Sequence, residues 1–206
     1  MKLINVFKAI LSESTEVSLL EKLSKSLEGE IPAQDSEVNN ILVNSGLSDY
    51  YQYLGHGTHG WAFLSKKDKK VAKVTNSKQE YDISKILIGK KTKSFGEFYN
   101  AIDTKNDYYV IVRKEYSKRL GNKMYDLLHD NSQDLYGYLL YDNKDIYNTF
   151  IGYALKGKNE KFIQWIVDFK KECKELGLEP SELDVEDGGI AKNIVIDAGN
   201  YKLIDF

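Results

Sequence analysis

Apolar residues at the start of the chain recur at helical spacing. Over residues 2–28 they lie three or four positions apart, with one serine-rich interruption, and this spacing predicts helix. Gly29 and then Pro32 follow the last apolar position, as glycine and proline commonly do after a helix. A further short helix is expected over about residues 36–44. We therefore interpret residues 1–49 as an N-terminal helical extension.

Aromatic and β-branched residues predict a β-sheet after this extension. Residues 50–74 read as three strands, separated first by a glycine turn and then by the charged turn Lys66–Lys70. Helical spacing returns over residues 80–88. Residues 108–112 are a candidate for a buried strand, and residues 98–102 are its expected antiparallel neighbour.

Helical spacing dominates the rest of the chain. Helices are expected over residues 127–140, 146–155 and 162–176, and two short strands over residues 193–196 and 201–204. An acidic, irregular stretch precedes these strands at residues 183–189. The order of helices, a strand-rich part, helices and a closing hairpin predicts an α+β fold, because a parallel sheet would need strands and helices in alternation.

The composition is that of a globular chain with nearly balanced charge. The 206 residues are 42% hydrophobic, which is enough for a core, and 29 basic residues stand against 31 acidic ones. We expect no nucleic-acid partner, because proteins that bind phosphate backbones usually carry an excess of Lys and Arg. The single cysteine, Cys173, is expected to be a buried or half-buried bystander in a reducing compartment.

The sequence also disfavours a zinc-binding protein and a secreted or membrane-spanning protein. The three histidines lack the spacing of metal ligands, so a structural zinc site is not expected. The apolar part of the N-terminus is too short and too interrupted for a signal peptide or a membrane span. We therefore expect a soluble, cytoplasmic protein with no membrane partner.

Gly55, Gly57 and Gly60 have the spacing G-x-G-x-x-G. In dinucleotide-binding folds such glycines open a helix, whereas in kinases they form the bend of a hairpin that lies over nucleotide phosphates. The bulky segment Trp61–Leu64 is a poor first turn of a helix and a good returning strand. The glycines are therefore expected in a β-hairpin that covers the phosphates of a bound nucleotide.

Lys73 lies between small apolar residues in the third expected strand. Such a lysine can be an outward-facing residue of an edge strand, or it can supply a cation to nucleotide phosphates. Its position one strand after the glycine hairpin favours the second interpretation. A carboxylate early in the next helix would orient it, and Glu80 fits, with Asp82 as the alternative.

Asn193 and Asp205 stand beside the two strands of the closing hairpin. An amide and a carboxylate so placed can converge on one Mg²⁺ ion, which prefers a few protein oxygen ligands together with nucleotide phosphates. The stretch from Asn193 to Phe206 resembles the protein-kinase sequence that runs from the catalytic-loop Asn to the Asp-Phe of the Asp-Phe-Gly motif. The match is closest over Lys202–Phe206.

The resemblance to the protein-kinase-like superfamily covers residues 50–206, where its elements occur in kinase order. It implies a bilobal fold, with a small β-rich N-lobe and hinge over residues 50–115 and a reduced helical C-lobe over residues 116–206. ATP would lie between the lobes, with its adenine on the backbone of the hinge-like strand. A compact chain rich in lysine and tyrosine is also similar to kinase-like proteins of bacteriophages, which would place it in the host cytoplasm.

The resemblance breaks at the catalytic loop. The family has an aspartate five positions before its metal-binding Asn, where this chain has Gly188. A one-residue insertion would make Asp187 the counterpart, a longer insertion would make it Asp184, and both can instead be solvated loop residues. The sequence ends at Phe206, before the activation segment of the family, so it is either a minimal kinase-like protein or an excerpt of a longer one.

The resemblance implies an ATP- and Mg²⁺-dependent phosphotransferase that acts on a protein Ser/Thr or on the hydroxyl of a small molecule. Lys73 would bind phosphates, Asn193 and Asp205 would bind Mg²⁺, and Asp187 or Asp184 would orient the acceptor hydroxyl. The irregular catalytic loop motivates an alternative, a pseudokinase or binding module that engages a partner protein without phosphoryl transfer. A dinucleotide-dependent oxidoreductase is disfavoured, because the residues after the last glycine read as strand.

Overall fold

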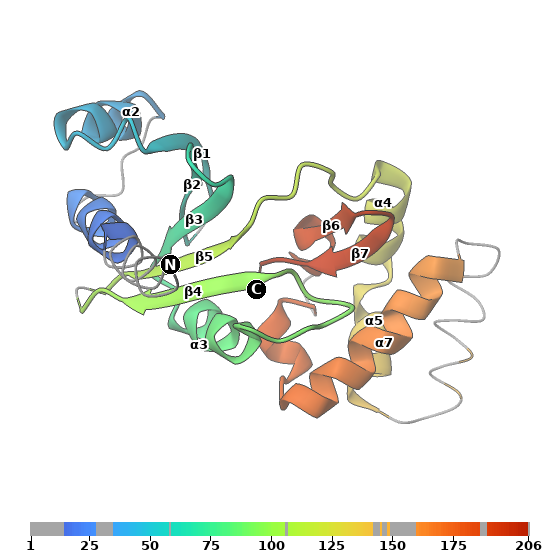
Figure 1. The fold of residues 1–206 in the computed structure, drawn as a ribbon. Coiled ribbons are helices and arrows are strands. Elements are labelled where there is room, and N and C mark those ends of the chain that lie inside the picture. The colour runs from blue at the N-terminus through green and yellow to red at the C-terminus, as the bar shows by residue number, and fades with distance from the viewer. Residues whose placement is uncertain are drawn as a thin grey trace, which may run out of the picture. The chain divides into compact units, whose positions relative to one another are not determined.

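A computed structural model describes residues 15–27, 35–57, 59–105, 107–141, 145, 148, 160–185 and 189–205. Figure 1 colours the ribbon by residue number, from blue at the N-terminus to red at the C-terminus. The chain divides into two compact units. The first, called the sheet unit below, comprises the described residues up to Ile88 together with Phe98–Glu115. The second, the helical unit, comprises Gly89–Glu97 and the described residues from Tyr116 onward.

Five antiparallel strands form the sheet of the sheet unit. They are β1 (Tyr51–Gly57), β2 (Gly60–Ser65), β3 (Lys70–Thr75), β4 (Phe98–Asp103) and β5 (Tyr109–Lys114). Their order across the sheet is β1-β2-β3-β5-β4, so β3 is the central strand. Consecutive strands β1, β2 and β3 need only short turns, because antiparallel neighbours can be joined by hairpins.

The central strands place apolar side chains on one common face of the sheet. Cross-strand pairs join Trp61 to Val74 and Phe63 to Ala72, and all four belong to one hydrophobic cluster. Paired residues lie on the same face, and alternate residues of a strand point to opposite faces. Lys73, between Ala72 and Val74, therefore lies on the other face.

Two N-terminal helical segments cover the apolar face. They are the helical residues 15–26 and α2 (Asp35–Asn44), both visible at the blue end of the chain in Figure 1. Six apolar side chains from these segments, or from residues next to them, belong to the same hydrophobic cluster as the sheet. Each is at most 3% exposed: Leu20, Leu23, Leu27, Val38, Leu42 and Leu47. The segment interpreted from sequence as an extension thus shares its core with the sheet.

Helix α3 (Lys78–Leu87) contacts β3, β4 and β5 on the face that carries Lys73. Ser77 caps its first turn, with the side-chain oxygen accepting a hydrogen bond from the backbone N–H of Glu80. The buried residues Glu80, Ile83 and Leu87 recur at helical spacing, which directs one face of α3 toward the sheet.

The helical unit is built around a cluster of five aromatic rings. Its elements are α4 (Asn122–Asp130), α5 (Ser132–Leu140), α7 (Glu160–Leu176), the 3-10 helices η2 (Pro180–Leu183) and η3 (Gly189–Asn193), and the hairpin strands β6 (Ile194–Asp197) and β7 (Asn200–Leu203). Ring centroids in the cluster lie 5.0 to 5.6 Å apart along the chain of contacts Phe95, Phe169, Trp165, Phe162 and Tyr201. Aromatic pairs at these distances stabilise the fold by more than the burial of their apolar area alone.

The segment Gly89–Glu97 follows α3 in sequence but belongs to the helical unit. The Glu172 carboxylate of α7 accepts hydrogen bonds from the backbone N–H groups of Lys93 (2.6 Å) and Ser94 (2.9 Å). On the other side, the N–H of Leu203 in β7 donates to the carbonyl of Ser94 (2.7 Å). Hydrogen bonds to a charged group are the stronger ones, so Glu172 fixes this crossing segment between α7 and the hairpin.

The predicted α+β class is confirmed, and so are the predicted strands of the sheet and the helix over residues 162–176. The single helix predicted over residues 127–140 is wrong, because α4 begins at Asn122 and ends before α5 begins. Asn131 separates the two helices, and its side chain donates to the carbonyl of Leu127 (2.7 Å). An Asn side chain that competes for backbone groups in this way favours a helix end.

Three predictions are not tested by the described residues, or only in part. The helix expected over residues 146–155 falls outside the described residues except at position 148, and so does the first half of the helix expected over residues 2–28. The bilobal kinase-like fold stays a prediction, since an antiparallel sheet followed by helices occurs in many families.

Among the described residues, every helix is too short or too polar to cross a membrane. Cys173 is 4% exposed on α7, which confirms the expected burial. Burial raises the pKa of its thiol to about 12, so the reactive thiolate is scarce at neutral pH.

We predict that Leu23→Ala destabilises the sheet unit by about 2–5 kcal/mol, the usual cost of truncating a fully buried leucine. Leu23 is 0% exposed in the cluster shared with the sheet. Val43→Ala on α2 is the control, because Val43 is 63% exposed and its truncation should change stability by less than about 0.5 kcal/mol. Urea unfolding followed by circular dichroism measures both; equal, small losses would mean that the helices add nothing to the core.

Candidate functional site

The three glycines of the motif lie in the β1–β2 hairpin, as expected from sequence. Gly55 has φ +141°, in a region that side chains rarely adopt, at an irregularity in the pairing of β1 with β2. Gly60 pairs with Thr75, and a Cβ atom there would lie 1.9 Å from the carbonyl oxygen of Val74. Gly57 has open space around its Cα.

Lys73 forms an ion pair with Glu80, with 2.7 Å between Nζ and Oε1. The lysine side chain is 14% exposed and that of the glutamate 2%. Asp82, the alternative partner, instead forms an exposed ion pair with Lys78, one turn earlier in α3. The cation is therefore positioned by a buried carboxylate on α3, at the centre of the sheet and beside the strand that carries the glycine hairpin.

A polar network beside the glycine hairpin was not predicted from sequence. The Tyr53 hydroxyl donates to Oδ1 of Asp35 (3.0 Å), and Nδ1 of His56 lies 3.0 Å from the same hydroxyl. Burial and the hydrogen bond to Asp35 raise the pKa of Tyr53 to about 12, so the hydroxyl stays protonated. Eighteen positions separate Asp35 from Tyr53, and no local spacing in the sequence indicates this link between α2 and β1.

The hairpin β6–β7 brings Asn193 and Asp205 to one end. Asn193 directly precedes β6 and Asp205 follows β7, and the N–H of Ile204 donates to the carbonyl of Asn193 (3.0 Å). At the other end, Ala198 and Gly199 have φ of 48° and 82°, which is the geometry of a two-residue type I′ turn. This tight turn sets the register that aligns the amide residue with the carboxylate residue.

Amide and carboxylate oxygens are donors that suit a hard cation such as Mg²⁺. The described residues contain no group of three His, Cys, Asp or Glu side chains that could hold a metal by themselves. A cation at Asn193 and Asp205 would therefore need further oxygen ligands, such as nucleotide phosphates or water.

Of the two candidate bases, Asp184 lies among the described residues and Asp187 lies outside them. Asp184 has φ +54°, its carbonyl accepts from the N–H of Ile190 (3.0 Å), and a Cβ atom on Gly189 would lie 1.6 Å from its Oδ2. The Asp184 carboxylate thus packs against the start of η3, the short helix that ends at Asn193.

We predict that Gly60→Ala destabilises the protein by about 1–3 kcal/mol or more, because the methyl group would overlap a backbone carbonyl that cannot move without parting β2 from β3. Gly57→Ala is the matched control in the same hairpin and should lie within about 0.5 kcal/mol of the wild type. Thermal unfolding of both variants tests this difference. If they proved equally stable, the close packing at Gly60 would be contradicted.

We also predict how substitutions of the Lys73–Glu80 ion pair change the free energy of unfolding. Glu80→Leu alone should cost up to about 3–5 kcal/mol, because it removes the buried carboxylate that faces the half-buried Lys73 ammonium. The double substitution Lys73→Met with Glu80→Leu should recover most of that loss, since apolar side chains of similar volume can replace a buried ion pair. Urea unfolding measures both. A double variant as unstable as the single one would indicate that the pair itself stabilises the fold.

No protein-family model matches this chain, and no curated protein matches it either. The resemblance to the protein-kinase-like superfamily consequently depends on the motifs of the sequence alone.

Proposed function

We propose that the protein is an ATP- and Mg²⁺-dependent phosphotransferase of the protein-kinase-like superfamily. The observation that carries the proposal is the Lys73–Glu80 ion pair, at 2.7 Å, in which a buried carboxylate on the helix after the central strand meets a half-buried ammonium on that strand. Taking a charged pair largely out of water costs free energy, and an apolar pair would serve packing equally well. A cation held in a fixed direction is what a site for phosphates requires.

The glycine hairpin supports the same assignment for the sheet unit. Gly60 pairs with Thr75 and Lys73 pairs with Ala62, so Lys73 and Gly60 lie two positions apart along the paired strands and on one face. Backbone N–H groups of the hairpin and the ammonium of Lys73 would together contact the phosphates. Gly55 and Gly57 would let the hairpin approach them without a side chain intervening.

In the helical unit, Asn193 and Asp205 would hold Mg²⁺ at the end of the β6–β7 hairpin. When bound with the nucleotide, the ion neutralises the charge of the phosphates. A set of one amide and one carboxylate suits Mg²⁺, because that ion usually keeps phosphate and water ligands in addition to those of the protein.

The proposed reaction transfers the terminal phosphoryl group of ATP to a hydroxyl oxygen of a protein Ser/Thr or of a small molecule. A bond forms between the acceptor oxygen and phosphorus while the bond from phosphorus to the ADP oxygen breaks. The proton of the acceptor passes to a carboxylate of Asp187 or Asp184. If neither residue can act as the base, the same residues would bind ATP in a pseudokinase that engages a partner protein.

We predict that ATP with Mg²⁺, at about 100 times its dissociation constant, raises the melting temperature of the wild type by roughly 5 °C or more. Lys73→Ala and Asp205→Ala should each abolish most of this shift, measured against the melting temperature of the same variant without ligand. Lys67→Ala and Asp197→Ala are the matched controls, since the first lies in the β2–β3 turn and the second at the opposite end of the β6–β7 hairpin.

Transfer of labelled phosphate from ATP to a generic protein acceptor, and to the chain itself, completes the test. Stabilisation together with transfer supports the kinase, and stabilisation with no transfer supports the pseudokinase. No stabilisation of the wild type by ATP and Mg²⁺ would overturn the nucleotide site altogether.

A further inference from the structure

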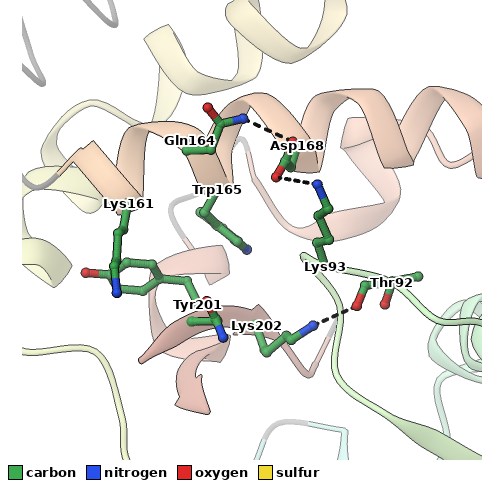
Figure 2. A pocket seen from close by; sticks show the side chains of 9 residues that line it. Thr92, Lys93, Lys161, Gln164, Trp165, Asp168, Tyr201 and Lys202 are labelled. Carbon is green, nitrogen blue, oxygen red and sulfur yellow. Dashed lines mark hydrogen bonds and ion pairs between the residues drawn. The ribbon is translucent and has the colours of Figure 1, made fainter. Parts of the chain in front are cut away.

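A pocket of about 460 Å³ lies within the helical unit, between α7, β7 and the segment that Glu172 fixes (Figure 2). This volume falls in the range of sites for small organic ligands. Trp165 and Tyr201 line it, with 5% and 9% of their surfaces exposed and their ring centroids 6.2 Å apart. They belong to the aromatic cluster of the unit, so part of this pocket has an apolar, aromatic wall.

Charged side chains line the pocket on several sides. Lys93, Lys161 and Lys202 are among the lining residues, and Asp168 is the one acidic residue among them. Figure 2 shows these lysines arriving from three different segments, with Asp168 paired to Lys93 at 3.6 Å. Positive charges that outnumber negative ones in a concave site with apolar walls attract anions.

Hydrogen bonds join the walls of the pocket to one another. The Trp165 indole N–H donates to the carbonyl of Ser94 (3.3 Å), and Lys202 donates to the carbonyl of Thr92 (2.7 Å). Glu172 binds the N–H groups of the same segment. A pocket whose walls are already ordered loses little conformational entropy when a ligand binds, which favours affinity.

We propose that this pocket binds a small organic anion built on a flat aromatic ring. The ring would pack on Trp165 and Tyr201, and its carboxylate or similar group would lie among the lysines. The pocket shares no lining residue with the nucleotide site proposed above, so this is a second ligand site with its own chemistry. A neutral aromatic ligand would gain from the wall alone, and a simple inorganic anion would gain from the lysines alone.

The test compares 1-naphthoate with its neutral analogue 1-naphthamide, using ligand-observed NMR on the full chain. The expected result is binding of naphthoate at least about 5-fold tighter than that of naphthamide. Lys161→Glu should weaken naphthoate by about 5-fold or more, because it reverses a charge that lines the pocket. It should leave naphthamide unchanged, which also shows that the variant is folded.

Lys171→Glu is the matched control, because Lys171 lies on the same helix and is exposed but does not line the pocket. It should change neither affinity. Asp205→Ala should also retain naphthoate binding, so loss of the nucleotide site would be distinguished from loss of this one. Equal binding of the two compounds, equal effects of the two lysine variants, or no binding of naphthoate would each overturn the proposal.

Discussion

Strand β3 sends neighbouring side chains to opposite faces of the sheet. Ala72 and Val74 enter the core that the N-terminal helices close, so Lys73 between them must point to the other face. A slip of β3 by one residue would bury the ammonium in that core and move the two apolar residues to the face that α3 contacts. Hydrophobic packing on one face thereby fixes the direction of the cation on the other, where α3 brings Glu80 to meet it.

In the helical unit, the position of the hairpin follows from the crossing segment in a comparable way. Ser94 is bound on one side by Glu172 of α7 and on the other by Leu203 of β7. A Cβ atom on Gly96 would lie 2.9 Å from a methyl group of Ile204, so glycine lets this segment lie close to the end of β7. Asp205 is the next residue, and its place therefore depends on contacts made by a segment more than a hundred positions earlier.

The sequence predicted well the structural features that depend on local periodicity. Alternation and glycine turns located the strands, and the order of residues along β3 indicated that Lys73 is unusual. It predicted poorly what depends on distant partners: the N-terminal leucines carry no mark of the sheet that they cover, and Glu172 resembles any other acidic residue of an amphipathic helix. The break at Asn131 was also missed, because apolar residues on both sides continue the same spacing although the backbone does not.

The glycine motif shows why a spacing alone overstates what is known of a site. Gly60 lacks a side chain because a backbone carbonyl occupies that space, and Gly55 because its backbone conformation has positive φ. Both requirements would exist in a hairpin that binds nothing. Gly57 meets neither condition, since it has open space and no such conformation. Its missing side chain is therefore the part of the motif that folding does not explain, and close approach of a phosphate is the reason that the proposed function supplies.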